Sequence, residues 1–113
     1  MGVRYLIMGT TKDPAAYRSL GDEMTATVKA NEPGTKRYNW FVSDDGHFVN
    51  EETFEDTAAM GAHIGAAQES GAFDRYMGLV EIEGVHVLGK VDEQAREMLA
   101  AFGARHYTKS RSI

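Results

Sequence analysis

Apolar and polar residues alternate in four stretches of the chain, with the period of two that is typical of β-strands. The strands predicted from this alternation span residues 3–8, 35–43, 47–54 and 79–88. The run Asp44-Asp45-Gly46 supplies a turn between the second and third stretches, which makes them a β-hairpin. Gly84 interrupts the last stretch and predicts a bulge or kink there.

A first helix is predicted by apolar residues that repeat at spacings of three and four, as the buried face of a helix does. It begins at Pro14, with Asp13 as its N-cap, and runs to about Ala30. The turn Asn31-Glu32-Pro33-Gly34 ends it, because a helix rarely continues past the residue before a proline.

Two further helices follow from the same spacing. One begins at Asp56 or Thr57, and the other has Asp92 as its N-cap and ends at Gly103. Residues 70–77 show no clear period and are predicted to be irregular.

The predicted order of elements is β-α-β-β-α-β, followed by a C-terminal helix and a short edge strand in residues 104–110. This order is that of a ferredoxin-like α+β sandwich. No repeat, low-complexity tract or linker divides the chain, so one domain is expected over residues 1–113.

The composition narrows the class of protein. With no cysteine, neither a disulfide framework nor a thiolate metal site is possible, and a net charge of −5 disfavours nucleic acid as a partner. No apolar stretch reaches the length of a signal peptide or a membrane span, so we expect a cytoplasmic protein with no membrane partner. Leu, Ile, Val and Phe make up only 22 of 113 residues, and this thin core predicts an oligomer.

The second predicted helix contains the first candidate functional residue. His63 lies at the edge of its apolar stripe, and Gly61 and Gly65 weaken the helix by about 1 kcal/mol each relative to Ala. The stripe itself consists of Met60, Ile64 and Ala67. Glu52 lies in the middle of the preceding strand between Phe48 and Phe54, so it is a second candidate for a buried polar role.

Residues 32–42, 52–63 and 84–89 together resemble the antibiotic biosynthesis monooxygenase family. The specific parts are a Glu-Pro-Gly-Thr turn that enters an aromatic strand, and a Glu-x-Phe-x-Asp-x-x-Ala-x-x-x-His block from Glu52 to His63. The resemblance implies a dimeric α+β barrel, in which the ferredoxin-like sheets of two subunits pack face to face and the helices cover the outer side. The expected partner is therefore a second copy of the chain.

Members of this family have several activities. Some are cofactor-free oxygenases of hydroxylated aromatics or quinols, some degrade haem, some are isomerases, and many have no demonstrated activity. Haem-degrading members have a Trp shortly before the His on the second helix, whereas the one Trp here, Trp40, precedes His63 by 23 residues. The resemblance therefore favours a cofactor-independent monooxygenase that acts on a small hydroxy-aromatic or quinol.

Such a reaction needs a base, a donor to the developing anion and a dry pocket. We expect His63 to accept the phenolic proton, Glu52 to orient its imidazole, and Asn39 to donate to the anion. The expected walls of the substrate pocket are aromatic: Tyr38, Trp40, Phe54, Phe73 and Tyr76.

Two alternatives stay open. Glu52 and His63 can instead hold the weak second helix in a non-catalytic homodimer that binds a small ligand or serves as a structural module. An isomerase on the same scaffold would need no oxygen. No cofactor is expected, and no metal either, because the four histidines lack the local spacing of metal ligands.

Overall fold

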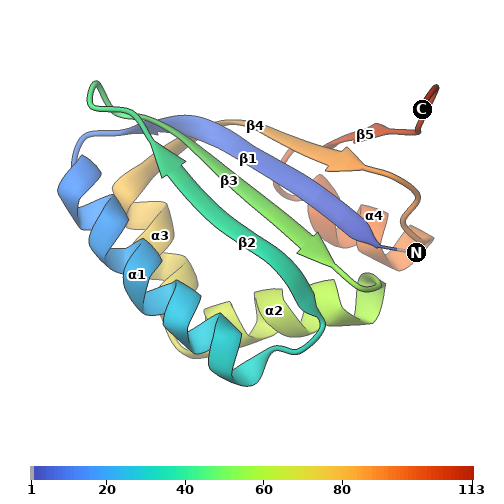
Figure 1. Cartoon of the computed structure of the whole chain (residues 1–113), viewed down its shortest axis with the longest axis horizontal. Coiled ribbons are helices and arrows are strands. Elements are labelled where there is room, and N and C mark those ends of the chain that lie inside the picture. Colours follow the sequence, from blue (N-terminus) through green and yellow to red (C-terminus); the bar gives the residue numbers. More distant parts are fainter. Residues whose placement is uncertain (1) are drawn as a thin grey trace.

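The computed structural model describes residues 2–113 as an α+β sandwich (Figure 1). Five strands and four helices follow one another along the chain. Their bounds are β1 Val3–Thr11, α1 Pro14–Asn31, β2 Thr35–Val42, β3 His47–Phe54, α2 Thr57–Glu69, α3 Ala72–Leu79, β4 Val80–Leu88, α4 Glu93–Ala100 and β5 Arg105–Tyr107.

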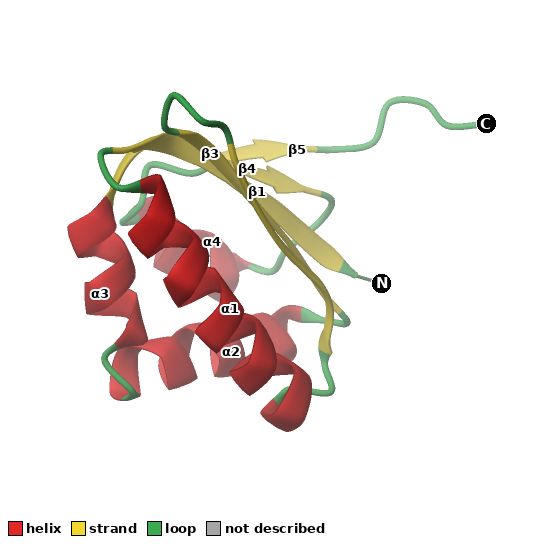
Figure 2. Cartoon of the chain, turned by 60° about the vertical axis from the view of Figure 1, so that its left-hand side comes forward, coloured by secondary structure: helices red, strands yellow, loops and turns green. Residues whose placement is uncertain are grey.

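The strands form one sheet in the order β2-β3-β1-β4-β5. All neighbours pair antiparallel except β4 and β5, which pair in parallel. Figure 2 shows the helices gathered on one face of this sheet, with the opposite face uncovered. The predicted ferredoxin-like sandwich with a C-terminal helix and short strand is confirmed.

The predicted helix starts are confirmed by their caps. The side chains of Asp13, Asp56 and Asp92 each accept a hydrogen bond from the backbone N–H three residues later. Gly103 has a φ of +68°, the left-handed conformation expected of a glycine that follows a helix. The sequence predicts these caps because each one depends only on residues that are close in sequence.

The prediction that residues 70–77 are irregular is wrong. Gly71 adopts a φ of +82° directly after α2, and the chain then forms α3. This helix is too short to show a clear period, and it is anchored by tertiary contact: the Tyr76 hydroxyl donates to Asn50 of β3 over 2.7 Å.

The core lies between the helices and the covered face of the sheet, in two apolar clusters. One cluster gathers strands β1, β3 and β4 against α2 and α4, and contains Val3, Tyr5, Phe54, Met60, Val87, Ala95 and Leu99. The other joins α1 to β3 and β4, and contains Tyr17, Phe48 and Val80. Trp40 packs against the second cluster.

The predicted irregularity at Gly84 is confirmed as a bulge. Met8 pairs with Gly84 but Gly9 pairs with Ile82, so one residue of β4 is left without a partner in β1. Gly9 is required here because a Cβ at this position would lie 1.9 Å from the carbonyl oxygen of Glu81.

The uncovered face of the sheet is partly apolar. Met8, Val49 and Phe41 are cross-strand neighbours there, on β1, β3 and β2, and Phe41 is 55% exposed. Within residues 2–113, no helix has the length and apolar character needed to cross a membrane.

The bulge gives a prediction about stability. Gly9→Ala should lower the free energy of unfolding by about 2 kcal/mol or more, because the added methyl group must push β1 away from β4. Gly61→Ala is the matched control: its Cβ meets nothing within 4 Å, so the change should raise stability by about 0.5–1 kcal/mol. Urea unfolding measures both, and equal effects of the two substitutions would contradict the close approach of β1 and β4.

Candidate functional site

Two carboxylates hold the imidazole of His63, one on each ring nitrogen. The Nδ1 atom lies 2.6 Å from Glu32 Oε1, and the Nε2 atom lies 3.0 Å from Glu52 Oε1. Each ring nitrogen therefore lies within hydrogen-bond distance of a carboxyl oxygen, an arrangement that favours the imidazolium form of His63. We call these three side chains the Glu-His-Glu chain.

The backbone around Glu32 explains how its side chain reaches His63. Glu32 is the C-cap of α1, and its backbone N–H donates to the carbonyl of Val28. The Pro33-Gly34 turn follows, and Gly34 lies so close to Ala59 that a Cβ would be 2.6 Å from the methyl group of Ala59. This tight contact brings the end of α1 onto α2.

All three side chains of the Glu-His-Glu chain are largely buried. Their exposed fractions are 7% for His63, 14% for Glu32 and 6% for Glu52. Burial alone lowers the pKa of His63, but the hydrogen bonds and negative charges of Glu52 and Glu32 outweigh it, so the pKa is raised above its ordinary value.

Glu52 has one oxygen that is fully engaged and one that is not. Its Oε1 accepts from His63 and also from the Tyr5 hydroxyl, at 3.1 Å. Its Oε2 takes part in none of the hydrogen bonds formed within residues 2–113. Since Glu52 lines a cavity, this second oxygen is available to a ligand.

The cavity has a volume of about 90 Å³ and lies between the sheet and the helices, bordered by both apolar clusters. Its charged lining groups are His63 and Glu52 alone, so no Lys or Arg contributes. The rest of the lining is aliphatic or aromatic apart from Asn50, and its rings belong to Tyr5, Tyr38, Trp40, Phe73, Tyr76 and Phe102.

Asn50 is the third polar feature of the cavity, with 1% of its surface exposed. Its Oδ1 accepts from the hydroxyls of Tyr17 and Tyr76, at 3.1 and 2.7 Å, which fixes the orientation of the amide. Its Nδ2 forms no hydrogen bond within residues 2–113. Its neighbour across the sheet, Trp40, has a buried indole N–H that also lacks a partner in the described chain.

The tyrosine hydroxyls around the site stay protonated at neutral pH. Burial, followed by the negative charge of Glu52, raises the pKa of Tyr5, Tyr17, Tyr38 and Tyr76. These hydroxyls can therefore donate hydrogen bonds but do not act as bases.

Six of the eight residues expected at the site line the cavity: His63, Glu52, Tyr38, Trp40, Phe73 and Tyr76. Asn39 does not, because strand alternation puts it on the uncovered face, where its amide donates to Glu51. Phe54 is also absent from the lining: it is fully buried in the core, where it packs against Tyr5 and His63.

Sequence reasoning missed three polar residues of the site. Asn50 was recognisable, because it shares a strand face with Glu52 at a spacing of two. Glu32 and Tyr5 gave no such signal, since their contacts with His63 and Glu52 join segments far apart in the chain. Within residues 2–113, no group of three or more acidic or histidine side chains is arranged to hold a metal ion.

No protein-family model matches this chain, and no curated protein matches it by sequence. Solved structures do match. MupZ from Pseudomonas fluorescens superposes with a TM-score of 0.77 at 14% identity, over 99% of this chain and 88% of MupZ.

Two further matches name an activity. SnoaB from Streptomyces nogalater, a cofactor-independent oxygenase, has a TM-score of 0.65 at 19% identity, over 80% of this chain and 94% of its own. A candidate antibiotic biosynthesis monooxygenase from Caulobacter crescentus has a TM-score of 0.67 at 20% identity, over 80% and 91%. At these identities the similarity establishes the monooxygenase-like fold.

The charge on His63 predicts a dependence of stability on pH. Because its pKa is raised in the folded state, its stabilising contribution is complete below the unfolded value of about 6.5 and is lost as the pH rises through the folded value. The difference in free energy of unfolding between wild type and His63→Gln should therefore shrink as the pH rises above about 6.5. His47→Gln, at an exposed site, is the control and should follow wild type throughout. A wild-type to His63→Gln difference that stays constant up to alkaline pH would contradict the charged imidazole.

Proposed function

We propose that this chain is a cofactor-independent monooxygenase that oxidises a small hydroxy-aromatic or quinol in the cavity. The observation that carries the proposal is Glu52, a buried residue that lines an otherwise largely apolar, aromatic cavity and whose Oε2 takes part in none of the hydrogen bonds within residues 2–113. A ring with a hydroxyl group matches this lining, because the ring packs on the aromatic walls and the hydroxyl donates to the carboxylate.

The first step is proton transfer from the substrate hydroxyl to Glu52 Oε2. His63 was the expected base, but each of its nitrogens faces a carboxyl oxygen. This arrangement favours the imidazolium, which has no lone pair to offer. Glu52 takes the role of base in its place. His63 then orients Glu52 and places a positive charge beside the substrate anion as it forms.

Asn50 and Trp40 take the role that was expected of Asn39. Their free N–H groups belong to paired residues of β3 and β2, and both residues line the cavity. As the substrate loses its proton, negative charge spreads from the reacting hydroxyl to another oxygen of the substrate. These N–H groups can donate hydrogen bonds to that oxygen and stabilise the charge. Within residues 2–113 the buried indole N–H of Trp40 has no partner, which is costly and supports a role in binding.

The second step is oxidation of the substrate anion by dioxygen. The anion is electron-rich and supplies the four electrons that reduce O₂. In the overall reaction the substrate loses two hydrogen atoms, one from a ring carbon and one from its hydroxyl group. That ring carbon gains one oxygen atom, and the second oxygen atom leaves as water with the two hydrogen atoms. The protein contributes proton transfer, stabilisation of the anion and exclusion of water.

Removal of the base tests this function. Glu52→Gln should lower the rate of oxygen uptake with a quinol panel by about 10²–10⁴-fold, because general-base catalysis contributes on this scale. Glu51→Gln makes the same change of charge one residue away on the uncovered face, and should retain the rate. An oxygen electrode measures both, with folding checked by circular dichroism.

Two outcomes would contradict the proposal. Conversion of substrate at an undiminished rate without oxygen would show proton transfer alone, as in an isomerase. A folded Glu52→Gln variant that keeps the wild-type rate would remove Glu52 from the reaction. If no activity is found and His63→Gln simply unfolds, the Glu-His-Glu chain serves the structural role that a non-catalytic module requires.

We also propose that the chain forms a homodimer by packing the uncovered faces of two sheets together. Met8, Val49 and Phe41 form an apolar row across three strands of this face. Phe41 is exposed, and Met8 and Val49 are partly exposed. Such a row is typical of a surface that is covered in solution.

Disruption of this row tests the dimer. Val49→Lys places a charge at the centre of the row and should convert the dimer to monomer at micromolar concentration, measured by sedimentation velocity. Gln68→Lys adds the same charge to an exposed position of α2 and should leave the dimer intact. A wild-type chain that sediments as a monomer would contradict the proposal.

A further inference from the structure

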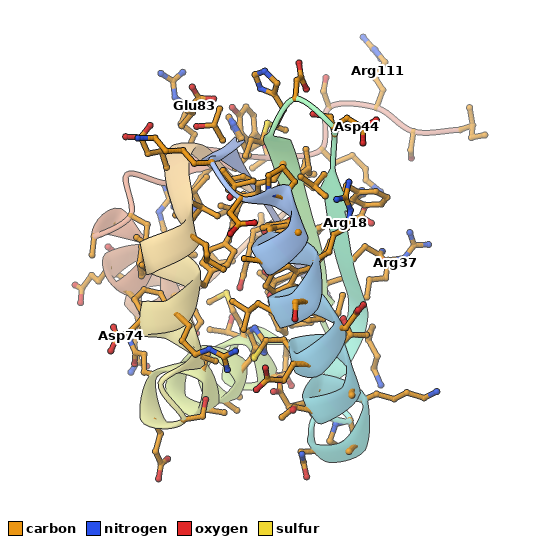
Figure 3. All side chains as sticks on the ribbon, turned by 90° about the vertical axis from the view of Figure 1, so that its left-hand side faces the viewer. Arg18, Arg37, Asp44, Asp74, Glu83 and Arg111 are labelled. Atoms are coloured by element: carbon orange, nitrogen blue, oxygen red, sulfur yellow. The ribbon has the colours of Figure 1, made fainter. Side chains whose placement is uncertain are left out.

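The site carries one net negative charge. Glu32 and Glu52 supply two negative charges and the His63 imidazolium supplies one positive charge, at distances of 2.6 and 3.0 Å. No Lys or Arg lines the cavity to balance the remainder. Arg18, Arg37 and Arg111 lie at the outside of the molecule (Figure 3).

This excess charge is largely buried: Glu52 and His63 line the cavity, and Glu32 contacts His63 from outside the lining. Glu52 is 5% exposed, and its Oε2 has no partner within residues 2–113. A buried charge without compensation is costly, and the low dielectric of the interior strengthens its attraction for a positive ligand. The same field repels an anionic ligand.

The walls of the cavity offer a place for a positive group. Trp40 contacts Tyr38 and Tyr76 at ring angles of 62° and 77°, with centroids 6.1 and 5.5 Å apart. All three rings line the cavity, Tyr38 and Trp40 from β2 and Tyr76 from α3. The face of an aromatic ring attracts a cation, and Trp does so most strongly.

We propose that the substrate is a hydroxy-aromatic amine, which binds as a cation. Its hydroxyl donates to Glu52 Oε2, and its ammonium group rests against the faces of Trp40, Tyr38 and Tyr76. The inference rests on the proposed function in taking this cavity as the substrate site. It adds that the substrate is positively charged, and it excludes hydroxy-aromatic acids as substrates.

Three matched phenols test the charge preference by isothermal titration calorimetry at neutral pH. Tyramine carries an ammonium group, tyrosol a neutral hydroxyl and 4-hydroxyphenylacetate a carboxylate on similar side chains. Tyramine should bind at least about tenfold more tightly than tyrosol, and 4-hydroxyphenylacetate more weakly than either.

Two variants locate the origin of the preference. Glu52→Gln keeps the shape of the side chain but removes the net charge, so the ratio of the Kd values for tyrosol and tyramine should fall close to one. Glu51→Gln removes the same charge from the uncovered face, where its partners are Arg4 and Asn39, and should leave the ratio as in wild type.

Equal affinity for the three phenols, tighter binding of the carboxylate, or no binding of any of them at millimolar concentration would overturn the inference. An equal loss of preference in both variants would also overturn it, because the effect would then follow the overall charge. The binding measurement needs no turnover. A preference for tyramine without oxygen uptake therefore supports this inference while the oxygenase proposal fails, and oxygen uptake without the preference does the reverse.

Discussion

The Glu-His-Glu chain is the interaction on which the rest of the site depends. It joins three segments far apart in sequence, namely the end of α1, the middle of α2 and the middle of β3. Helix α2 needs this tie because Gly61 and Gly65 weaken it. Loss of one partner from such a buried group leaves an uncompensated charge, which typically costs about 3–5 kcal/mol. The structural role of His63 and the chemical role that we propose for it therefore depend on the same contacts.

Side chains alternate between the two faces of the sheet along each strand, so the two faces carry different sets of residues. On β3, Asn50 and Glu52 face the helices and supply the polar groups of the cavity, while Glu51 between them faces outward and pairs with Arg4. The covered face therefore holds the polar groups of the cavity. The uncovered face carries the apolar row on which we propose that a second copy packs. This chain has few large aliphatic residues, and a cavity reduces the apolar surface that its core buries. Burial of the apolar row in the proposed dimer would offset that loss.

Local signals in the sequence predicted most of the fold. The caps Asp13, Asp56 and Asp92 and the bulge at Gly84 each follow from neighbouring residues, whereas α3 was missed because packing of Tyr76 on Asn50 stabilises it. The candidate site was predicted in part. Strand alternation identifies which residues share a face and would have excluded Asn39. It cannot reveal the contact of Glu32 with His63, which is made by the way α1 and α2 pack.

We propose that two carboxylates hold His63 as a cation, which leaves Glu52 as the base. Nitrogen-15 NMR of the histidine ring tests it most directly, because the chemical shift of each ring nitrogen reports whether that nitrogen carries a hydrogen. Both nitrogens of His63 should be protonated at neutral pH in the ligand-free protein. A spectrum in which one nitrogen of His63 lacks its hydrogen at that pH would contradict it.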